Sequence, residues 1–215
     1  MRALNDLRVV ELGTEVSAPY CARLFADLGA DVIKVEAPGG DPSRARGPFA
    51  GNEPDPEESA TFHYLNAGKR GVVADLDDVA GRHFFHSLLE GADVLVENVE
   101  PGAHARWGLE AASLLARYPH LVSVSISPYG RSGPWADRPG TDLTAQAASS
   151  LPLALGMGDR EPLRSPFDQA DYQAALHGFA ASLCALYARR SSGRGQGIDI
   201  SVAQVMAYCV GGMHL

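Results

Sequence analysis

Short runs of apolar, mostly β-branched residues alternate with helical stretches along this chain, and this alternation constrains the fold more than any other feature. The first two runs are residues 7–12 (LRVVEL) and 31–36 (DVIKVE). Between them we expect a helix that Ser17 caps, with Pro19 in its first turn and Gly29 just beyond its end. The first 36 residues therefore predict a β-α-β unit, whose crossover should be right-handed.

The alternation continues to the end of the chain. Further strands are expected at residues 72–76, 93–98, 121–127 and 196–200, with helices between them. Parallel strands joined by helices form a sheet that is covered on both faces. We therefore predict a doubly wound α/β fold with a mostly parallel sheet. No repeat, low-complexity tract or linker divides the sequence, so residues 1–215 should form a single α/β domain.

One stretch does not fit the alternation. Residues 37–60 concentrate proline, glycine and charge over a length that is too great for a simple connection. We interpret this stretch as a functional loop. Its two arginines, Arg44 and Arg46, are expected to be solvated loop charges.

Composition narrows the function classes. A net charge of −8 and a pI of about 5.3 argue against nucleic acid or an anionic membrane as the main partner. The cysteines, Cys21, Cys184 and Cys209, are odd in number and widely spaced, which is typical of reduced thiols in a cytosol. No apolar run approaches the ~18 residues of a membrane span. We therefore expect a cytoplasmic protein.

Several motifs for cofactor chemistry do not occur in the sequence. There is no G-x-G-x-x-G for a nicotinamide or flavin, no P-loop, no G-x-S-x-G and no C-x-x-C. His83 and His86 share a helix face but lack companions at metal-ligand spacing. We expect no metal site and no tightly bound cofactor.

The strongest single candidate for chemistry is Asp171, at the head of a long helix. Free N–H groups and the helix dipole favour an anion there, so the carboxylate should be ionised near neutral pH and could act as a nucleophile. An alternative is ordinary helix-start chemistry, with Asp168 as the cap and Asp171 as an acidic third position. Spacing alone leaves both interpretations open.

The same helix carries two different ridges. The apolar ridge recurs at helical spacing and should face the core; it comprises Tyr172, Leu176, Phe179, Leu183 and Leu186. The ridge that includes Asp171 has small residues at Ala174, Ala175, Gly178, Ser182 and Ala185. Another backbone or a ligand could approach this second ridge closely.

Six segments in order carry a family resemblance: residues 7–44, 65–76, 92–109 and 123–149, the helix of Asp171, and residues 191–204. Together they resemble the class III coenzyme A transferases, which include formyl-CoA, carnitine-CoA and bile-acid-CoA transferases and the α-methylacyl-CoA racemases. The resemblance implies an interlaced homodimer of chains about twice this length. It also implies coenzyme A or acyl-CoA as a substrate and a carboxylic acid as the acceptor.

The resemblance assigns roles to individual positions. Glu15, Val16 and Ser17 match a segment whose backbone lies along coenzyme A near the reacting centre. Asn98 and Val99 match positions that contact the pantetheine arm, and Arg106 matches a basic residue near the nucleotide phosphates. Asp171 matches the catalytic aspartate, which would form an anhydride and then a thioester with coenzyme A. We expect the ligand edge to comprise residues 13–18, 98–106 and 139–142.

The sequence departs from the family pattern at several positions. Thr141 stands where the racemases carry a histidine, which favours transfer over racemisation because threonine is no acid–base group. Ala37, Ala74 and Asp77 replace basic or larger residues around the nucleotide, and the smaller second domain does not follow. The chain could therefore be a transferase that needs a further copy or partner chain, a non-catalytic CoA-binding or assembly subunit, or a truncated product.

Overall fold

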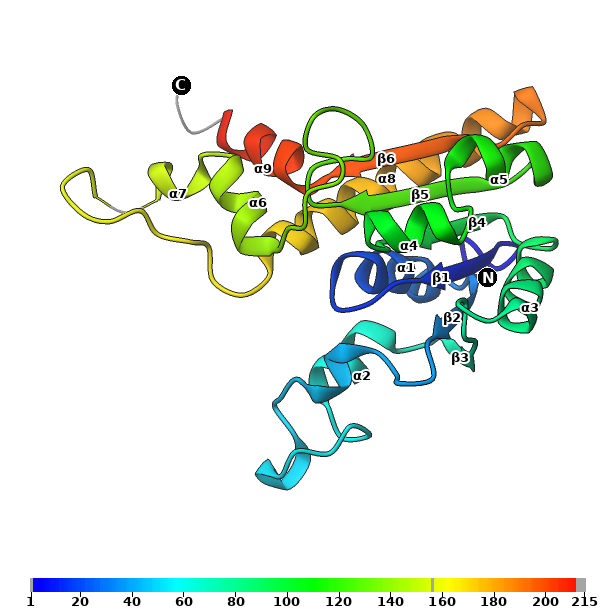
Figure 1. Cartoon of the computed structure of the whole chain (residues 1–215), viewed down its shortest axis with the longest axis horizontal. Helices are drawn as coiled ribbons and strands as arrows, with labels where there is room; N and C mark the ends of the chain where they lie inside the picture. Colours follow the sequence, from blue (N-terminus) through cyan, green and yellow to red (C-terminus); the bar gives the residue numbers. More distant parts are fainter. Residues whose placement is uncertain (1, 156, 212–215) are drawn as a thin grey trace.

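Six parallel strands form one sheet at the centre of the molecule (Figure 1). The computed structural model describes residues 2–155 and 157–211, and its strands follow the order β3-β2-β1-β4-β5-β6. Their bounds are Arg8–Leu12 (β1), Asp31–Glu36 (β2), Arg70–Val73 (β3), Val94–Glu97 (β4), Val122–Ser127 (β5) and Gly197–Ser201 (β6). Every neighbouring pair is parallel, which confirms the predicted sheet.

Helices cover both faces of this sheet. One face packs against α1 (Ser17–Asp27) and α8 (Gln169–Ser192), with α6 (Asp142–Ala148), α7 (Leu151–Ala154) and α9 (Val202–Gly211) beside them. The opposite face packs against α3 (Val79–Leu89) and α5 (Ala111–Arg117), together with residues that flank α4 (Pro101–Arg106). Each face has its own apolar core, so the doubly wound arrangement is confirmed.

The edge strand β3 differs from its predicted position. It spans Arg70–Val73 instead of 72–76, because residues 70–73 are the ones that pair with Ile33–Glu36 of β2. After Val73 the chain turns toward α3, and the Asp75 carboxylate accepts a hydrogen bond from the backbone of Asp77. Ala74 and Leu76 are buried in this turn and still contribute to the core.

The strand order reverses between β1 and β4. Strands β2 and β3 lie on one side of this pair, and β5 and β6 lie on the other. In open α/β sheets, ligands bind beyond the carboxyl ends of the strands at such a switch point. The loops that follow Leu12 and Glu97 border this position, so we expect a ligand to bind between them.

Residues 37–60 leave the sheet and return through α2 (Ala60–Asn66), which projects from the body of the molecule in Figure 1. The excursion contains two 3-10 turns, Pro42–Ala45 and Ala50–Asn52. Ser59 ties it together, because its hydroxyl donates to the carbonyls of Ser43 and Arg46. Arg44 binds Glu36 and lies over the Phe62 ring, 3.7 Å from its centroid. The expectation of free loop charges was therefore wrong for this arginine.

The small ridge of α8, and not its large apolar ridge, faces the core, which corrects the prediction. Its buried residues are Ala170, Ala174, Ala175, Gly178, Ser182 and Ala185. Leu176 of the predicted apolar stripe is 41% exposed, while Phe179 and Leu183 pack only at the margin of the core. The small residues take the central positions because the helix lies too close to the sheet for larger side chains there, and Phe179 packs beside them on the Phe25 ring.

Gly178 shows how close that packing is. A Cβ at this position would lie 3.4 Å from side-chain carbons of Val124 and Ile126 on β5, and 3.5 Å from Cys21 Sγ on α1. Helix α8 therefore rests directly on β5 and α1, as the contacts among these elements also show. This close contact fixes the position of the helix start, where Asp171 lies.

The last helix begins as predicted. The Ser201 hydroxyl accepts a hydrogen bond from the Gln204 backbone at 3.3 Å, and Val202, Val205 and Met206 are buried. Tyr208 on the outer side is 79% exposed. No helix within residues 2–155 and 157–211 has the length and apolar character that a membrane crossing requires.

Candidate active site

Two cavities lie at the carboxyl edge of the sheet. The larger, about 680 Å³, extends from the turn after β1 across the ends of β4 and β5 to the starts of α6 and α8. The smaller, about 280 Å³, lies between the ends of β1, β2 and β4. Thr14, Asn98 and Val99 line both cavities. The two spaces therefore meet at the switch point of the sheet.

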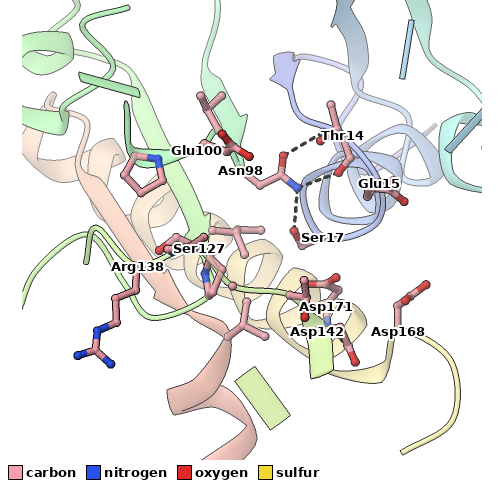
Figure 2. Close-up of a pocket in the computed structure, with 18 of the residues that line it drawn as sticks. Thr14, Glu15, Ser17, Asn98, Glu100, Ser127, Arg138, Asp142, Asp168 and Asp171 are labelled. Carbon is pink, nitrogen blue, oxygen red and sulfur yellow. Dashed lines mark hydrogen bonds between the residues drawn. The ribbon is translucent and has the colours of Figure 1, made fainter. Parts of the chain in front are cut away.

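Asn98 joins the two loops at that switch point. Its amide oxygen accepts from the Thr14 backbone at 2.9 Å, and its amide nitrogen donates to the Thr14 carbonyl at 2.8 Å and to the Ser17 hydroxyl at 3.0 Å (Figure 2). Ser17 was predicted to cap α1, but the N-cap is Val16 and no side chain caps the helix. The N–H groups of the first turn of α1 are therefore free of side-chain capping at the cavity wall.

Buried charged residues hold the turn after β1, which contains Glu15, in its conformation. Glu15 has a φ of 60°, which few residues other than glycine adopt. Its backbone N–H donates to Asp41 Oδ1 at 3.1 Å, and the other oxygen of Asp41 is 2.8 Å from Lys34 Nζ. Lys34 also binds Glu11 at 2.8 Å and donates to the Gly13 carbonyl. This buried network holds the unusual backbone of Glu15 in place.

A second charge network crosses the mouth of the larger cavity. Arg46 Nη1 donates to Glu15 Oε2 at 2.8 Å, and Nη2 donates to Asp168 Oδ2 at 2.5 Å. Arg46 thus connects the loop of residues 37–60 to the turn after β1 and to the start of α8. The prediction of a solvated loop charge was wrong here too, because Arg46 lies between two carboxylates that line the cavity.

Asp171 lies in the first turn of α8 and lines the larger cavity. The expected cap, Asp168, makes no capping hydrogen bond with its side chain. Instead Asp142, at the start of α6, caps α8: its Oδ2 accepts from the N–H groups of Ala170 at 2.8 Å and Asp171 at 3.2 Å. Figure 2 shows the three aspartates together at this end of the helix. Distant residues therefore create the environment of Asp171.

Gln146 strengthens this arrangement. Its side chain is fully buried, and its amide nitrogen donates to Asp142 Oδ1 at 2.5 Å. Its amide oxygen accepts from the Ser165 backbone at 2.9 Å. Because Gln146 and Asp142 lie one turn apart on α6, they hold the segment before α8 against α6.

The surroundings of Asp171 change its ionisation. Burial, together with the nearby carboxylates of Asp142, Asp168 and Glu15, raises the pKa of Asp171 to about 7, and the guanidinium of Arg46 opposes this rise. We expected the helix start to keep this group ionised near neutral pH, and the raised pKa contradicts that expectation. Desolvation and carboxylate repulsion outweigh the favourable N–H groups, because Asp142 already occupies those N–H groups.

The other predicted positions are distributed unevenly. Glu15, Ser17, Asn98, Val99 and Asp171 all line the larger cavity, as do residues 139–142. Val16 is buried and does not line it. Arg106 is not among the residues that line either cavity. The loops of the predicted ligand edge therefore meet. Helix α4 reaches the cavities through Pro101, Gly102 and Ala103, but Arg106 at its end does not.

Arg106 is bound by a residue that the sequence interpretation treated as a departure. Its Nε donates to Asp77 Oδ1 at 3.0 Å, and Trp107 Nε1 donates to the same oxygen at 2.9 Å. The hydrogen bond from Trp107 lowers the pKa of Asp77 most, and the hydrogen bond from Arg106 lowers it further. Both members of the ion pair are more than half exposed. A phosphate role for Arg106 stays a prediction, and it would require exchange of Asp77 for the ligand.

Thr141 has a structural role. Its hydroxyl and that of Thr144 exchange hydrogen bonds with each other's backbone N–H and form a capping box at the start of α6. This box fixes the first residue of the helix, Asp142, which in turn caps α8. A short S/T-x-x-S/T spacing in the sequence could have indicated the box, but not its connection to Asp171.

Arg131 is a further residue that the sequence interpretation missed. Its Nη2 donates to buried Glu97 at 2.9 Å and to the Val99 carbonyl at 2.6 Å, and its Nε donates to Ser125 at 2.6 Å. Glu97 also accepts from the Val99 backbone at 2.7 Å. This network shapes the loop after β4, which carries two predicted contact positions.

The site thus combines the partly buried carboxyl group of Asp171, a helix start without a side-chain cap and a cavity with polar and apolar lining residues. Within the described parts of the chain, no group of three or more His, Cys, Asp or Glu side chains is placed to hold a metal ion. Attack on an activated acyl group by Asp171 is the chemistry that these features best support.

Comparison with known proteins identifies relatives of the chain. The pattern of CoA-transferase family III matches residues 4–215. Subunit BbsE of the succinyl-CoA:(R)-benzylsuccinate CoA-transferase of Thauera aromatica is 42% identical over 206 residues, covering 96% of this chain and 50% of that protein. The beta subunit of succinyl-CoA–L-malate CoA-transferase of Chloroflexus aurantiacus is 35% identical, with 96% and 50% covered.

A solved structure gives the same result. The CAIB/BAIF family protein from Brucella suis superimposes with a TM-score of 0.89 at 36% identity, covering 98% of this chain and 56% of that chain. The chain spans about half the length of the curated relatives it matches.

Proposed function

Because the chain belongs to CoA-transferase family III, we propose that it takes part in moving coenzyme A from an acyl-CoA donor to a carboxylic acid acceptor. Relatives named for succinyl-CoA suggest a short dicarboxylic acyl group as the donor. The proposal places all 215 residues in one CoA-binding domain. The meeting of Asp171 and the β1 and β4 loops in one cavity is the single observation that carries it.

The two cavities suit an extended thioester. The smaller one, between β1, β2 and β4, has the position at which doubly wound folds take the nucleotide part of a ligand. The pantetheine arm would pass Asn98 and Val99, which line both cavities, and would bring the thioester toward Asp171. The free N–H groups at the start of α1 would donate to the oxyanion of the transition state.

The reaction would proceed by covalent catalysis. An oxygen of the Asp171 carboxylate attacks the thioester carbon, the C–S bond breaks, and a mixed anhydride and CoA thiolate form. The thiolate then attacks the Asp171 acyl carbon and releases the donor acid, which leaves an aspartyl-CoA thioester. The acceptor carboxylate attacks the carbonyl carbon of this thioester, its C–S bond breaks, and a second mixed anhydride and CoA thiolate form. The thiolate attacks the acceptor acyl carbon of that anhydride, which gives the acceptor acyl-CoA and regenerates the Asp171 carboxylate. No net proton is consumed.

The surroundings of Asp171 fit these needs in part. An anhydride must be kept from water, and Asp171 is partly buried at the wall of the cavity. Its raised pKa makes the carboxylate a stronger base than an exposed aspartate, while still leaving a large ionised fraction near pH 7. Racemisation is less favoured, because Thr141 caps α6 and supplies no second acid–base group.

The experiment is an isotope transfer assay. The protein is mixed with succinyl-CoA and ¹³C-labelled succinate, and mass spectrometry follows the label into the thioester. We expect transfer in the wild type and a loss of many orders of magnitude in Asp171→Asn, which keeps the shape but lacks the anion. Asp27→Asn, on the outer side of α1, is the matched carboxylate control. Full transfer in Asp171→Asn would show that the nucleophile is a different group.

A non-catalytic role is the competing interpretation. The chain covers about half of its curated relatives, and both of the relatives above are named as subunits. A CoA-binding or assembly subunit would bind coenzyme A in calorimetry yet show no label transfer, alone or with any partner chain found with it. Binding without transfer would therefore favour this second function.

A further inference from the structure

Arg46 occupies a position that neither the sequence interpretation nor the proposed chemistry uses. It lies in the loop of residues 37–60 and reaches the mouth of the larger cavity, where its two terminal nitrogens bind Glu15 and Asp168. The two carboxylates belong to the turn after β1 and to the segment before α8. Its side chain is 39% exposed, so the ion pairs are formed at the cavity and not in the core.

The groups around Asp171 carry an excess of negative charge. Glu15 approaches from the turn after β1, Asp142 from α6 and Asp168 from the residue before α8, and all of them line the same cavity. Two uncharged titratable groups, Tyr20 of α1 and Tyr172 of α8, pack edge to face nearby. Each carboxylate disfavours the anion of Asp171.

The other arginines that line the cavity bind other groups or lie on an exposed segment. Arg131 binds buried Glu97, and Arg138 lies over the Trp135 ring, 5.0 Å from its centroid. Arg164 lines the cavity on the exposed segment before α8. Arg46 is the cation that counteracts the effect of the three carboxylates on Asp171. Its fork geometry lets one side chain bind two of them at once.

We propose that Arg46 is a positioning residue for Asp171: its two ion pairs hold Glu15 and Asp168 at the cavity wall, and its positive charge favours the ionised form of Asp171. This inference rests on the proposed function, in which Asp171 must be ionised to attack. It also gives the loop of residues 37–60 a role, since that loop carries the charge to the site.

The inference can be tested by whether the ionised fraction of Asp171 rises or falls in each variant. Removing Arg46, Glu15 or Asp168 breaks the same bridge, so a purely structural bridge would affect Asp171 in the same direction in all three variants. Removing a positive charge and removing a negative charge have opposite electrostatic effects. Arg46→Gln should therefore favour protonated Asp171, and Glu15→Gln and Asp168→Asn should favour ionised Asp171.

The measurement is a ¹³C NMR titration of aspartate carboxyl carbons, with the Asp171 signal assigned by its loss in Asp171→Asn. At pH 7 we expect the ratio of ionised to protonated Asp171 to fall about three- to tenfold in Arg46→Gln and to rise in the other two variants. Arg46→Lys keeps the charge and should lie between wild type and Arg46→Gln. Amide spectra show whether each variant is folded. If Arg46→Gln does not fold, Arg46→Lys takes its place in the comparison.

Shifts of one sign in all three variants, or no shift in Arg46→Gln, would overturn the proposal. The titration needs no substrate, so its result is separate from the transfer assay. Opposite shifts without label transfer would support the role of Arg46 in the ionisation of Asp171 and would count against the proposed transfer function. Label transfer without opposite shifts would support the proposed transfer function and reject the role of Arg46 in the ionisation of Asp171.

Discussion

At the scale of single residues, the chemistry of Asp171 depends on neighbours that are distant in sequence. Asp142 is 29 residues away and occupies the N–H groups at the start of α8. Arg46 acts from the loop of residues 37–60. A helix start alone would lower the pKa of an aspartate, but burial and three carboxylates raise the pKa of this one to about 7. Its ionisation is therefore a property of the assembled site.

This ionisation predicts how stability depends on pH. The native pKa of Asp171 is above that of an unfolded aspartate, so between about pH 4 and 7 the native state binds more protons than the unfolded state. The contribution of Asp171 to stability should thus fall as pH rises through this range, by up to about 1.4 kcal/mol per pH unit. Urea unfolding at several pH values should show Asp171→Asn gaining stability relative to wild type as pH rises. A difference that does not change with pH would contradict the raised pKa.

Arg106 gives a second prediction at this scale. If it binds a nucleotide phosphate, Arg106→Ala should weaken coenzyme A binding by about 1–3 kcal/mol, the range for a lost charge-assisted contact. Asp77→Asn should strengthen binding, because it releases Arg106 from its ion pair. Calorimetry with pantetheine, which lacks the phosphates, is the control and should show neither effect. If both variants bind coenzyme A with the affinity of the wild type, Arg106 does not contact the ligand.

At the scale of elements, the sequence was sufficient for the sheet and insufficient for the packing of α8. Strands β1, β2, β4 and β5 could be predicted because buried parallel strands are short apolar runs with helices between them. The edge strand β6 was also predicted, although it is only partly buried. The edge strand β3 was displaced, since its position depends on pairing with β2. Periodicity assigned the large apolar ridge of α8 to the core, but close contact with β5 and α1 selected the small ridge.

The candidate site shows the same division. Asp171 could be considered because it lies at a helix start, but the resemblance to the family is what pointed to Asp171, Glu15 and Asn98 as site residues. Arg46, Asp142 and Gln146 could not be predicted, because their roles arise from contacts over 19 to 122 residues of sequence. No local pattern indicates that an aspartate of α6 caps α8. Such contacts become visible only when the chain is folded.

Gly178 tests the packing of α8. Ordinary contact distances surround a Cβ at this position, so Gly178→Ala should be tolerated or slightly stabilising, as alanine favours helices by about 1 kcal/mol. Gly178→Leu should overpack the contact with β5 and α1 and cost about 1–3 kcal/mol or more in unfolding free energy. Ala180→Leu, on the exposed side of the same helix, is the control. Equal stability of the two leucine variants would mean that α8 does not pack as closely as described.

At the scale of the whole molecule, several large apolar side chains lie on the surface near the site. Leu153 of α7, Phe167 before α8 and Tyr208 of α9 are each at least 75% exposed. Helices α6 and α7 and the segment that leads to α8 project from the body in Figure 1. Exposed apolar patches of this kind favour association. We therefore propose that this side of the molecule contacts a second copy or a partner chain.

This proposal predicts association in solution. Light scattering across a concentration series should report a dimer or a complex with a partner chain. Phe167→Ser together with Leu153→Ser should shift the population toward monomer, because both substitutions remove apolar area from the same side. Tyr187→Ser, on a distant exposed turn of α8, is the control. A stable monomer at every concentration, with no partner chain present, would count against the association.

The most direct measurement of the central claim is to trap the covalent intermediate on Asp171. The protein, with a partner chain if one is found, is mixed with succinyl-CoA and hydroxylamine, and the modified residue is mapped by mass spectrometry. We expect a hydroxamate on Asp171, because hydroxylamine captures both the anhydride and the thioester that Asp171 would form. A hydroxamate on Glu15 or Asp168, with Asp171 unmodified, would contradict the assignment of Asp171 as the nucleophile.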